Sequence, residues 1–130
     1  MDIEGVALSI KELYERGLKL RTKIFGEKAV AARMSANGEF GKPLQDLINT
    51  YAYGDVWQRP GLDHRTRSLT VLAMTAALNR PHEFSVHMKG ALANGCTPEE
   101  IRELCLMIAM YCGIPASNDA HRLALEALGR

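Results

Sequence analysis

Glu83 and His87 are the two side chains in this sequence whose types and spacing best suit proton transfer. They lie four residues apart in a segment opened by Arg80 and Pro81, and residues four apart share one side of a helix. A neighbouring carboxylate favours the protonated imidazolium and fixes its orientation, and an imidazolium can donate a proton to a carbon or oxygen centre. The same spacing is also common among ion pairs on exposed helix surfaces, so the residues leave both interpretations open.

The segment that carries this pair also has an apolar sector. With about 3.6 residues per turn, the sector consists of Phe84, Met88, Ala91 and Leu92. Glu83 and His87 lie on its flank. An acid and an imidazole held at the edge of a buried face could form a proton-transfer site.

Four arginines and one tryptophan could contact an anionic substrate. A guanidinium presents a planar fork that matches a carboxylate in two-point contacts. The candidates are Arg59, Arg65, Arg67 and Arg80, together with Trp57. Arg80 could reach over the first turn toward Glu83, or it could be a solvated loop residue. At least two of the arginines could instead pair with local acids such as Asp55 and Asp63, and Trp57 could simply be a packing residue.

Other chemistries find less support in the residues. His82 and His87 are five apart, whereas a zinc-binding helix needs histidines four apart, so we predict no metal site. The three cysteines form no Cys-x-x-Cys pair, and we expect Cys105 and Cys112 to pack as small apolar side chains. No phosphate-binding loop or nucleophile elbow occurs, and a net charge of +1 does not favour nucleic acid.

Length and composition predict one soluble domain spanning residues 1–130. The chain is 47% apolar and 24% charged, as in an ordinary globular protein. The start, Met1 to Glu4, lacks the features of a signal peptide, and the longest mostly apolar run, residues 69–78, is too short to cross a bilayer. We therefore expect a cytoplasmic location without membrane contact.

Apolar residues recur at helical spacing along the chain, and no segment alternates as a strand would. We predict an all-α bundle of six helices at about residues 10–24, 43–56, 63–78, 81–94, 98–112 and 116–128. Pro43 would open the second helix, after a loop at residues 36–41. Its inward face would consist of Leu44, Leu47, Ile48, Tyr51 and Ala52. The third helix is apolar nearly all round between residues 69 and 78, which predicts a central, buried position.

Several segments together resemble the γ-carboxymuconolactone decarboxylase family. They read YAYGDVWQRPGLD at 51–63, RTRS at 65–68, AALNR at 76–80, ALANG at 91–95, TPEEIRE at 97–103 and YCGIPA at 111–116, with Glu83 and His87 between them. The resemblance implies the all-α alkylhydroperoxidase-D-like fold and a ring-shaped homo-oligomer, a trimer or hexamer. The peroxidase branch has its two cysteines and histidine at the positions of Arg80, Glu83 and His87, so the chain resembles the decarboxylase branch.

That resemblance implies the decarboxylation of 4-carboxymuconolactone to 3-oxoadipate enol-lactone and CO2 in aromatic-compound catabolism. The substrate is a small lactone carboxylate that supplies its own electron sink, so no cofactor is expected. His87 would be the proton donor, oriented by Glu83, and Arg80 would stabilise the enolate. Arg59, Arg65 or Arg67 would anchor the substrate, and Trp57 would wall the pocket.

One segment departs from the family pattern. Residues 117–121 read SNDAH, where the family has Ala-Asn-x-Ala-Phe. His121 replaces an aromatic residue, and if it lines the pocket it bears on the choice of substrate more than on the reaction type. Two alternatives therefore stand beside the main hypothesis: a paralogue acting on a related unsaturated lactone or keto acid, and a non-catalytic helical assembly protein.

Overall fold

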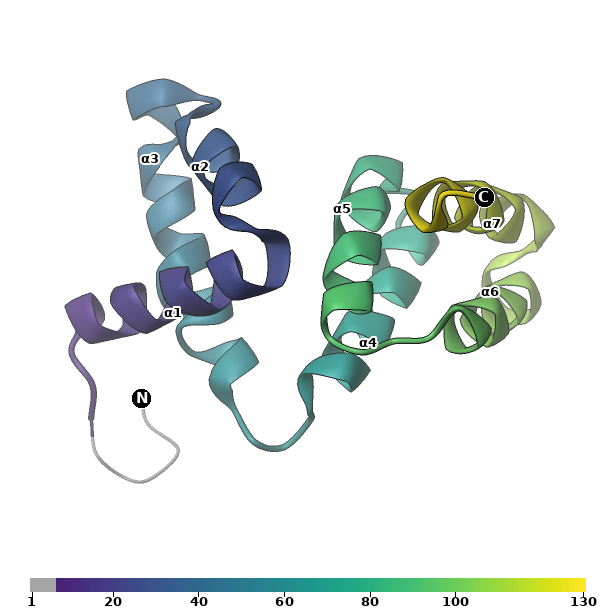
Figure 1. Ribbon diagram of the computed structural model, residues 1–130, viewed down its shortest axis with the longest axis horizontal. Coiled ribbons are helices and arrows are strands. Elements are labelled where there is room, and N and C mark those ends of the chain that lie inside the picture. The colour runs from purple at the N-terminus through teal and green to yellow at the C-terminus, as the bar shows by residue number, and fades with distance from the viewer. Residues whose placement is uncertain (1–6) are drawn as a thin grey trace. The chain divides into compact units, whose positions relative to one another are not determined.

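A computed structural model describes residues 7–130, and these residues form helices and no strand (Figure 1). The seven α-helices are α1 (Ile10–Phe25), α2 (Glu27–Ser35), α3 (Gly38–Leu47), α4 (His64–Ala77), α5 (Pro81–Ala93), α6 (Pro98–Cys112) and α7 (Ile114–Leu128). A π-helix (Ile48–Tyr53) and a 3₁₀ turn (Val56–Gln58) follow α3. The start of the chain, Met1 to Glu4, which we expected to lack a signal peptide, lies outside the described residues.

The chain divides into two compact units, one ending at Leu62 and one running from Asp63 to Arg130. Within the described residues no helix has the length and apolar character that crossing a membrane requires.

The first unit is built on the contact between α1 and the π-helix. Ser9 caps α1 in a reciprocal capping box with Glu12, which fixes where the helix begins. Gly17 allows the backbones to approach closely, because a Cβ atom there would overlap the carbonyl oxygen of Asn49. The Nε of Arg16 donates a hydrogen bond of 2.6 Å to the carbonyl oxygen of Gly54, just after the π-helix.

Arg21 is a buried charge in this unit, with 5% of its surface exposed. Its Nη1 donates to Oε1 of Gln45 at 2.9 Å and to Oδ1 of Asn49 at 3.0 Å. Burial lowers the pKa of Arg21 from its ordinary value, since a charge is less stable away from water. The guanidinium therefore ties α1 to α3 and the π-helix through neutral amide oxygens.

The prediction for the second helix was wrong in both its start and its buried face. The helix begins at Gly38, inside the predicted loop, and Pro43 lies in its interior. Leu44 and Leu47 are 56% and 54% exposed, and Tyr51 is also exposed, whereas Asn49 and Thr50 are buried. The wider turns of the π-helix rotate the residues after Leu47 away from the α-helical register, which explains the changed face from Ile48 onward. Leu44 and Leu47 precede it and lie on the exposed side of α3.

The number of helices also differs from the six predicted. Gly26, with φ +92°, ends α1 and separates it from α2, a short helix that the sequence did not reveal. Only glycine adopts that conformation without strain, so a single residue makes the break.

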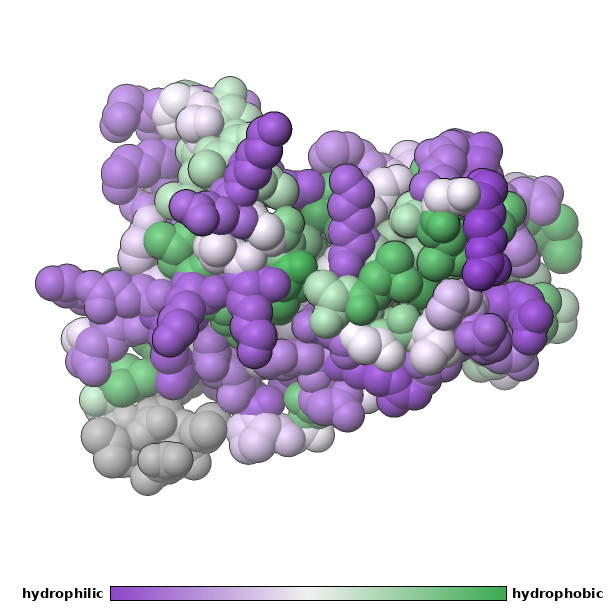
Figure 2. All heavy atoms as spheres, viewed as in Figure 1, coloured by the Kyte–Doolittle hydropathy of each residue, from purple (hydrophilic) through white to green (hydrophobic). Residues whose placement is uncertain are grey.

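The second unit consists of α4 to α7 around one apolar core. The buried side chains of this core are Leu72, Phe84, Met88, Ala91, Cys96, Ile101, Cys105, Ile108, Ala120, Leu123 and Ala124. Figure 2 shows hydrophobic residues gathered between α5 and α7, with hydrophilic residues around them. The predicted starts are confirmed: Asp63 caps α4, Pro81 opens α5, and Thr97 caps α6 in a capping box with Glu100.

Two burial predictions in this unit were wrong. The helix α4 is not buried all round, because Met74 is 56% exposed and only Ser68 and Leu72 are fully buried. Cys112 is exposed, whereas Cys105 is buried as predicted. The cause is that Cys112 is the last residue of α6, beyond the part of that helix that meets the core.

Candidate functional site

Glu83 and His87 occupy successive turns of α5, as the sequence predicted. Pro81 is the first residue of the helix, where its missing N–H costs nothing. Phe84, Met88 and Ala91 face the core and fix the rotation of the helix. Glu83 then lies exposed in the first turn and His87 lies half-buried one turn later. The negative charge of Glu83 is favourably placed near the positive end of the helix dipole.

The half-burial of His87 suits a proton donor. The flanking residues Val86 and Met88 are both buried, so the imidazole leaves the helix beside closely packed surface. A charge in such a position interacts more strongly with a bound ligand than it would in bulk water.

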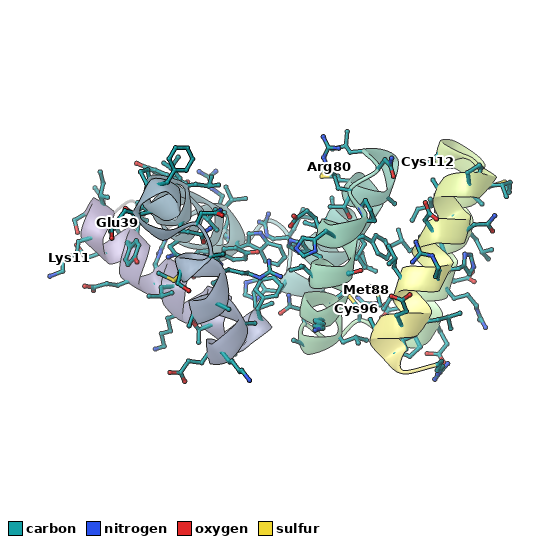
Figure 3. All side chains as sticks on the ribbon, turned by 90° about the horizontal axis from the view of Figure 1, so that it is seen from above. Lys11, Glu39, Arg80, Met88, Cys96 and Cys112 are labelled. Atoms are coloured by element: carbon teal, nitrogen blue, oxygen red, sulfur yellow. The ribbon has the colours of Figure 1, made fainter. Side chains whose placement is uncertain are left out.

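Arg80 lies at the N-cap of α5 and lines a cavity of about 340 Å³ in the second unit. Figure 3 shows Arg80 and Cys112 at the same end of this unit, and both line the cavity, as do Phe84 and Asp119. Neither Glu83 nor His87 is among the residues that line it. Neither Cys112, which we expected to pack as a small apolar side chain, nor Asp119 on α7 was predicted from the sequence to line a cavity.

Arg65 is held by an acid within the second unit. Its guanidinium forms an ion pair with Glu100, and its Nε donates to Oε1 of Glu100 at 3.1 Å. The same oxygen accepts the backbone N–H of Thr97 at 2.8 Å. Arg65 therefore links the first turn of α4 to the first turn of α6.

Arg59 is held by an acid within the first unit. Its Nε and Nη2 donate to the two carboxylate oxygens of Asp55 at 3.1 and 3.2 Å. These contacts raise the pKa of Arg59. Asp55 was one of the two acids expected to pair with an arginine. The other, Asp63, instead caps α4 by accepting the backbone N–H of Thr66 at 2.7 Å, which lowers the pKa of Asp63.

Arg67 is half-buried on α4, one residue before the buried Ser68. The hydroxyl of Ser68 accepts a hydrogen bond of 2.9 Å from Nδ2 of Asn94, at the end of α5. This contact fixes α4 against α5 next to Arg67.

Trp57 is a packing residue of the first unit, with 7% of its surface exposed. Its ring stacks on Tyr53 with centroids 5.5 Å apart, and Tyr53 meets Phe25 edge to face at 5.9 Å. Of the predicted site residues, Trp57 and Arg59 belong to the first unit. Arg65, Arg67, Arg80, Glu83 and His87 belong to the second.

Acidic, histidine and cysteine side chains do not cluster in threes as metal ligands anywhere in residues 7–130. Burial raises the pKa of the Cys96 and Cys105 thiols, so both stay protonated at neutral pH.

Comparison with known proteins places this chain in one family. Residues 42–126 match the model of the carboxymuconolactone decarboxylase family. The chain is 40% identical over 89% of its length to 4-carboxymuconolactone decarboxylase from Acinetobacter baylyi, covering 87% of that protein. It is 39% identical over 85% of its length to nitrosuccinic acid decarboxylase from Metarhizium robertsii, covering 77% of it. An uncharacterised 15.0 kDa protein of Paracoccus denitrificans is 37% identical over 61% of the chain and 60% of its own length.

The chain belongs to the carboxymuconolactone decarboxylase family. The resemblance seen in the sequence is thereby confirmed.

Proposed function

We propose that this decarboxylase converts 4-carboxymuconolactone to 3-oxoadipate enol-lactone and CO2. The observation that carries the proposal is the 40% identity, over 89% of the chain, to a protein named for that activity. An alignment over 89% of the chain necessarily includes the stretch from Trp57 to His87.

The proposed reaction requires the protein to bind the substrate, to stabilise the negative charge of the enolate, and to supply one proton. The bond between the ring carbon and the carboxylate breaks, and its electron pair moves through the ring double bond to the lactone carbonyl oxygen. The resulting dienolate takes up a proton at carbon to give the enol-lactone. Because the substrate itself accepts the electrons, the proposed reaction needs no coenzyme.

We assign the proton to His87 and the orientation of its imidazole to Glu83. The support is the four-residue spacing on α5 and the half-burial of His87. A carboxylate one helical turn away, on the same side of α5, is placed to orient the imidazole toward the substrate.

We assign anchoring of the substrate carboxylate to Arg67, because a half-buried guanidinium is less screened than an exposed one. Arg59 and Arg65 would each have to loosen a contact with Asp55 or Glu100 to bind substrate, so we expect smaller effects from them. The contact of Trp57 with substrate and the stabilisation of the enolate by Arg80 stay predictions, to be tested through the KM and kcat of Trp57→Phe and Arg80→Gln.

A second substrate is favoured by the similarity to nitrosuccinic acid decarboxylase. A nitro group next to the departing carboxylate can accept the electron pair as a nitronate, in the same role as the lactone carbonyl. The required protein groups are the same: an anchor for a carboxylate and a proton donor.

The deciding experiment offers both acids to the purified protein and follows CO2 release, with ultraviolet absorbance as a second readout. Turnover of the lactone supports the first substrate, and turnover of nitrosuccinate alone supports the second. Activity only toward other unsaturated lactones or keto acids would indicate a paralogue. Absence of both turnover and dicarboxylate binding would indicate a non-catalytic assembly protein.

We also propose that the chain forms a homo-oligomer, a trimer or hexamer. The support is a group of apolar side chains exposed on and just after α6: Leu106, Met107, Met110, Tyr111 and Ile114. Met110 is 73% and Tyr111 82% exposed, which is unusual for a monomer surface. A monomeric sedimentation coefficient at micromolar concentration would contradict this proposal.

A further inference from the structure

A second, smaller cavity of about 180 Å³ lies between α6 and α7. Its apolar wall includes Ile101, Ala124 and Leu128, and the Cys105 thiol completes that wall. Burial raises the pKa of Cys105, so the thiol is a neutral surface there. Glu83, His87 and Arg80 do not line this cavity, which separates it from the residues assigned to decarboxylation.

His121 is the polar group of this cavity, and its tautomer follows from its contacts. Nδ1 lies 2.7 Å from the carbonyl oxygen of Ser117, an acceptor, so Nδ1 carries the hydrogen. The hydroxyl of Ser117 donates to the carbonyl of Cys105 at 2.7 Å, which turns an oxygen lone pair toward Nδ1 at 3.3 Å. Both contacts agree on the same tautomer. In the tautomer with its hydrogen on Nδ1, Nε2 is an acceptor, and no hydrogen bond to it occurs among the described residues.

Charged side chains at the cavity favour an anion. The residues Arg102 and Arg130 both line it, together with the acidic residue Glu99. The contact of Arg102 with Glu103 is 3.9 Å long and both side chains are about two-thirds exposed, so it restrains Arg102 only weakly.

We propose that this cavity binds a small hydroxycarboxylic acid with an apolar body. The carboxylate meets Arg102 and Arg130, and the hydroxyl donates a hydrogen bond to Nε2 of His121. The hydrocarbon body packs on Ile101 and Leu128. The cavity volume of about 180 Å³ is enough for a single small ring.

Three matched probes test each part of this recognition: trans-4-hydroxycyclohexanecarboxylate, cyclohexanecarboxylate, which lacks the hydroxyl, and trans-4-hydroxycyclohexanecarboxamide, which lacks the charge. Binding is followed by the imidazole signals of His121 and His87 in nitrogen–proton spectra of the intact protein. The hydroxy acid should shift His121 in a saturable way, with a Kd about 10-fold lower than that of either matched compound. Equal binding of all three, or no saturable shift at His121, would overturn the proposal.

Two variants locate the site on the protein. His121→Phe and Arg102→Gln should each weaken binding of the hydroxy acid about 10-fold. The matched controls, His82→Gln and Arg122→Gln, change an exposed histidine and an exposed arginine that do not line the cavity, and should leave binding unchanged. If His121→Phe does not fold, Arg102→Gln still decides the question. Shifts confined to His87 would show that the acid occupies the decarboxylation site instead and would refute the proposal.

Discussion

Arg65 and the backbone N–H of Thr97 bind the same carboxylate oxygen of Glu100. Glu100 thus closes the capping box of α6 and also holds the first turn of α4. The residue that completes the cap of α6 therefore also contacts the first turn of α4. Two substitutions of Glu100 separate the contribution of the cap from that of the ion pair.

Glu100→Gln keeps the hydrogen-bond acceptor of the capping box and removes the ion pair, whereas Glu100→Ala removes both. We expect Glu100→Gln to lower the free energy of unfolding by less than about 1 kcal/mol, because the pair is partly exposed. Glu100→Ala should cost about 1 to 2 kcal/mol. Denaturant unfolding measures both, with the exposed Glu99→Ala as the control. Equal losses for the two variants would show that the cap contributes nothing.

His87→Ala should lower kcat by about 10²-fold or more, because it removes the proposed proton donor. Glu83→Gln should have a smaller effect, since the imidazole remains and loses only the carboxylate proposed to orient it. The measurement is steady-state decarboxylation, with His82→Ala as a control from the same helix. Unchanged kcat in a folded His87→Ala variant would remove His87 from the mechanism.

Arg67→Lys should raise KM about 10-fold while changing kcat little, because an ammonium group cannot reproduce a two-point contact with a carboxylate. Arg122→Lys, an exposed change on α7, serves as the control. A fall in kcat with constant KM would instead place Arg67 in transition-state stabilisation.

Asp63 makes stability depend on pH in the acid range. Its folded pKa is lowered by the hydrogen bond from Thr66, so its contribution is complete above the unfolded pKa and is lost as pH falls through the folded pKa. Asp63→Asn keeps an acceptor for Thr66 but does not titrate. Between about pH 4 and pH 2, wild type should therefore lose stability more steeply than the variant in matched unfolding experiments. Parallel pH profiles would contradict this.

The sequence predicted the second unit well because its helices carry explicit start signals. Asp63 and Thr97 cap the helices that follow them, and Pro81 occupies the first position of its helix. It predicted the first unit poorly, since the change from α- to π-helix after Leu47 leaves no residue signature. The α1–α2 break depends on the φ angle of Gly26, and glycine also occurs inside helices, as at Gly17.

For the candidate site, the sequence predicted where Glu83 and His87 lie on α5, but it did not predict which residues surround the site. Four-residue spacing fixes Glu83 and His87 on one side of the helix. The acidic partners of Arg59 and Arg65 differ in how far along the chain they lie from the arginine. Asp55 lies four residues from Arg59, whereas Glu100 lies 35 residues from Arg65, and only the folded chain reveals such a partner.

The π-helix has a consequence for how the family diverges. Removing one residue between Ile48 and Tyr53 would return this stretch to ordinary α-helical winding and turn Tyr53 by roughly 100° about the helix axis. Tyr53 would leave its stack with Trp57, and the rest of the helix would rotate with it. A one-residue gap here, when relatives are aligned, would mark proteins in which a different side chain supports that tryptophan.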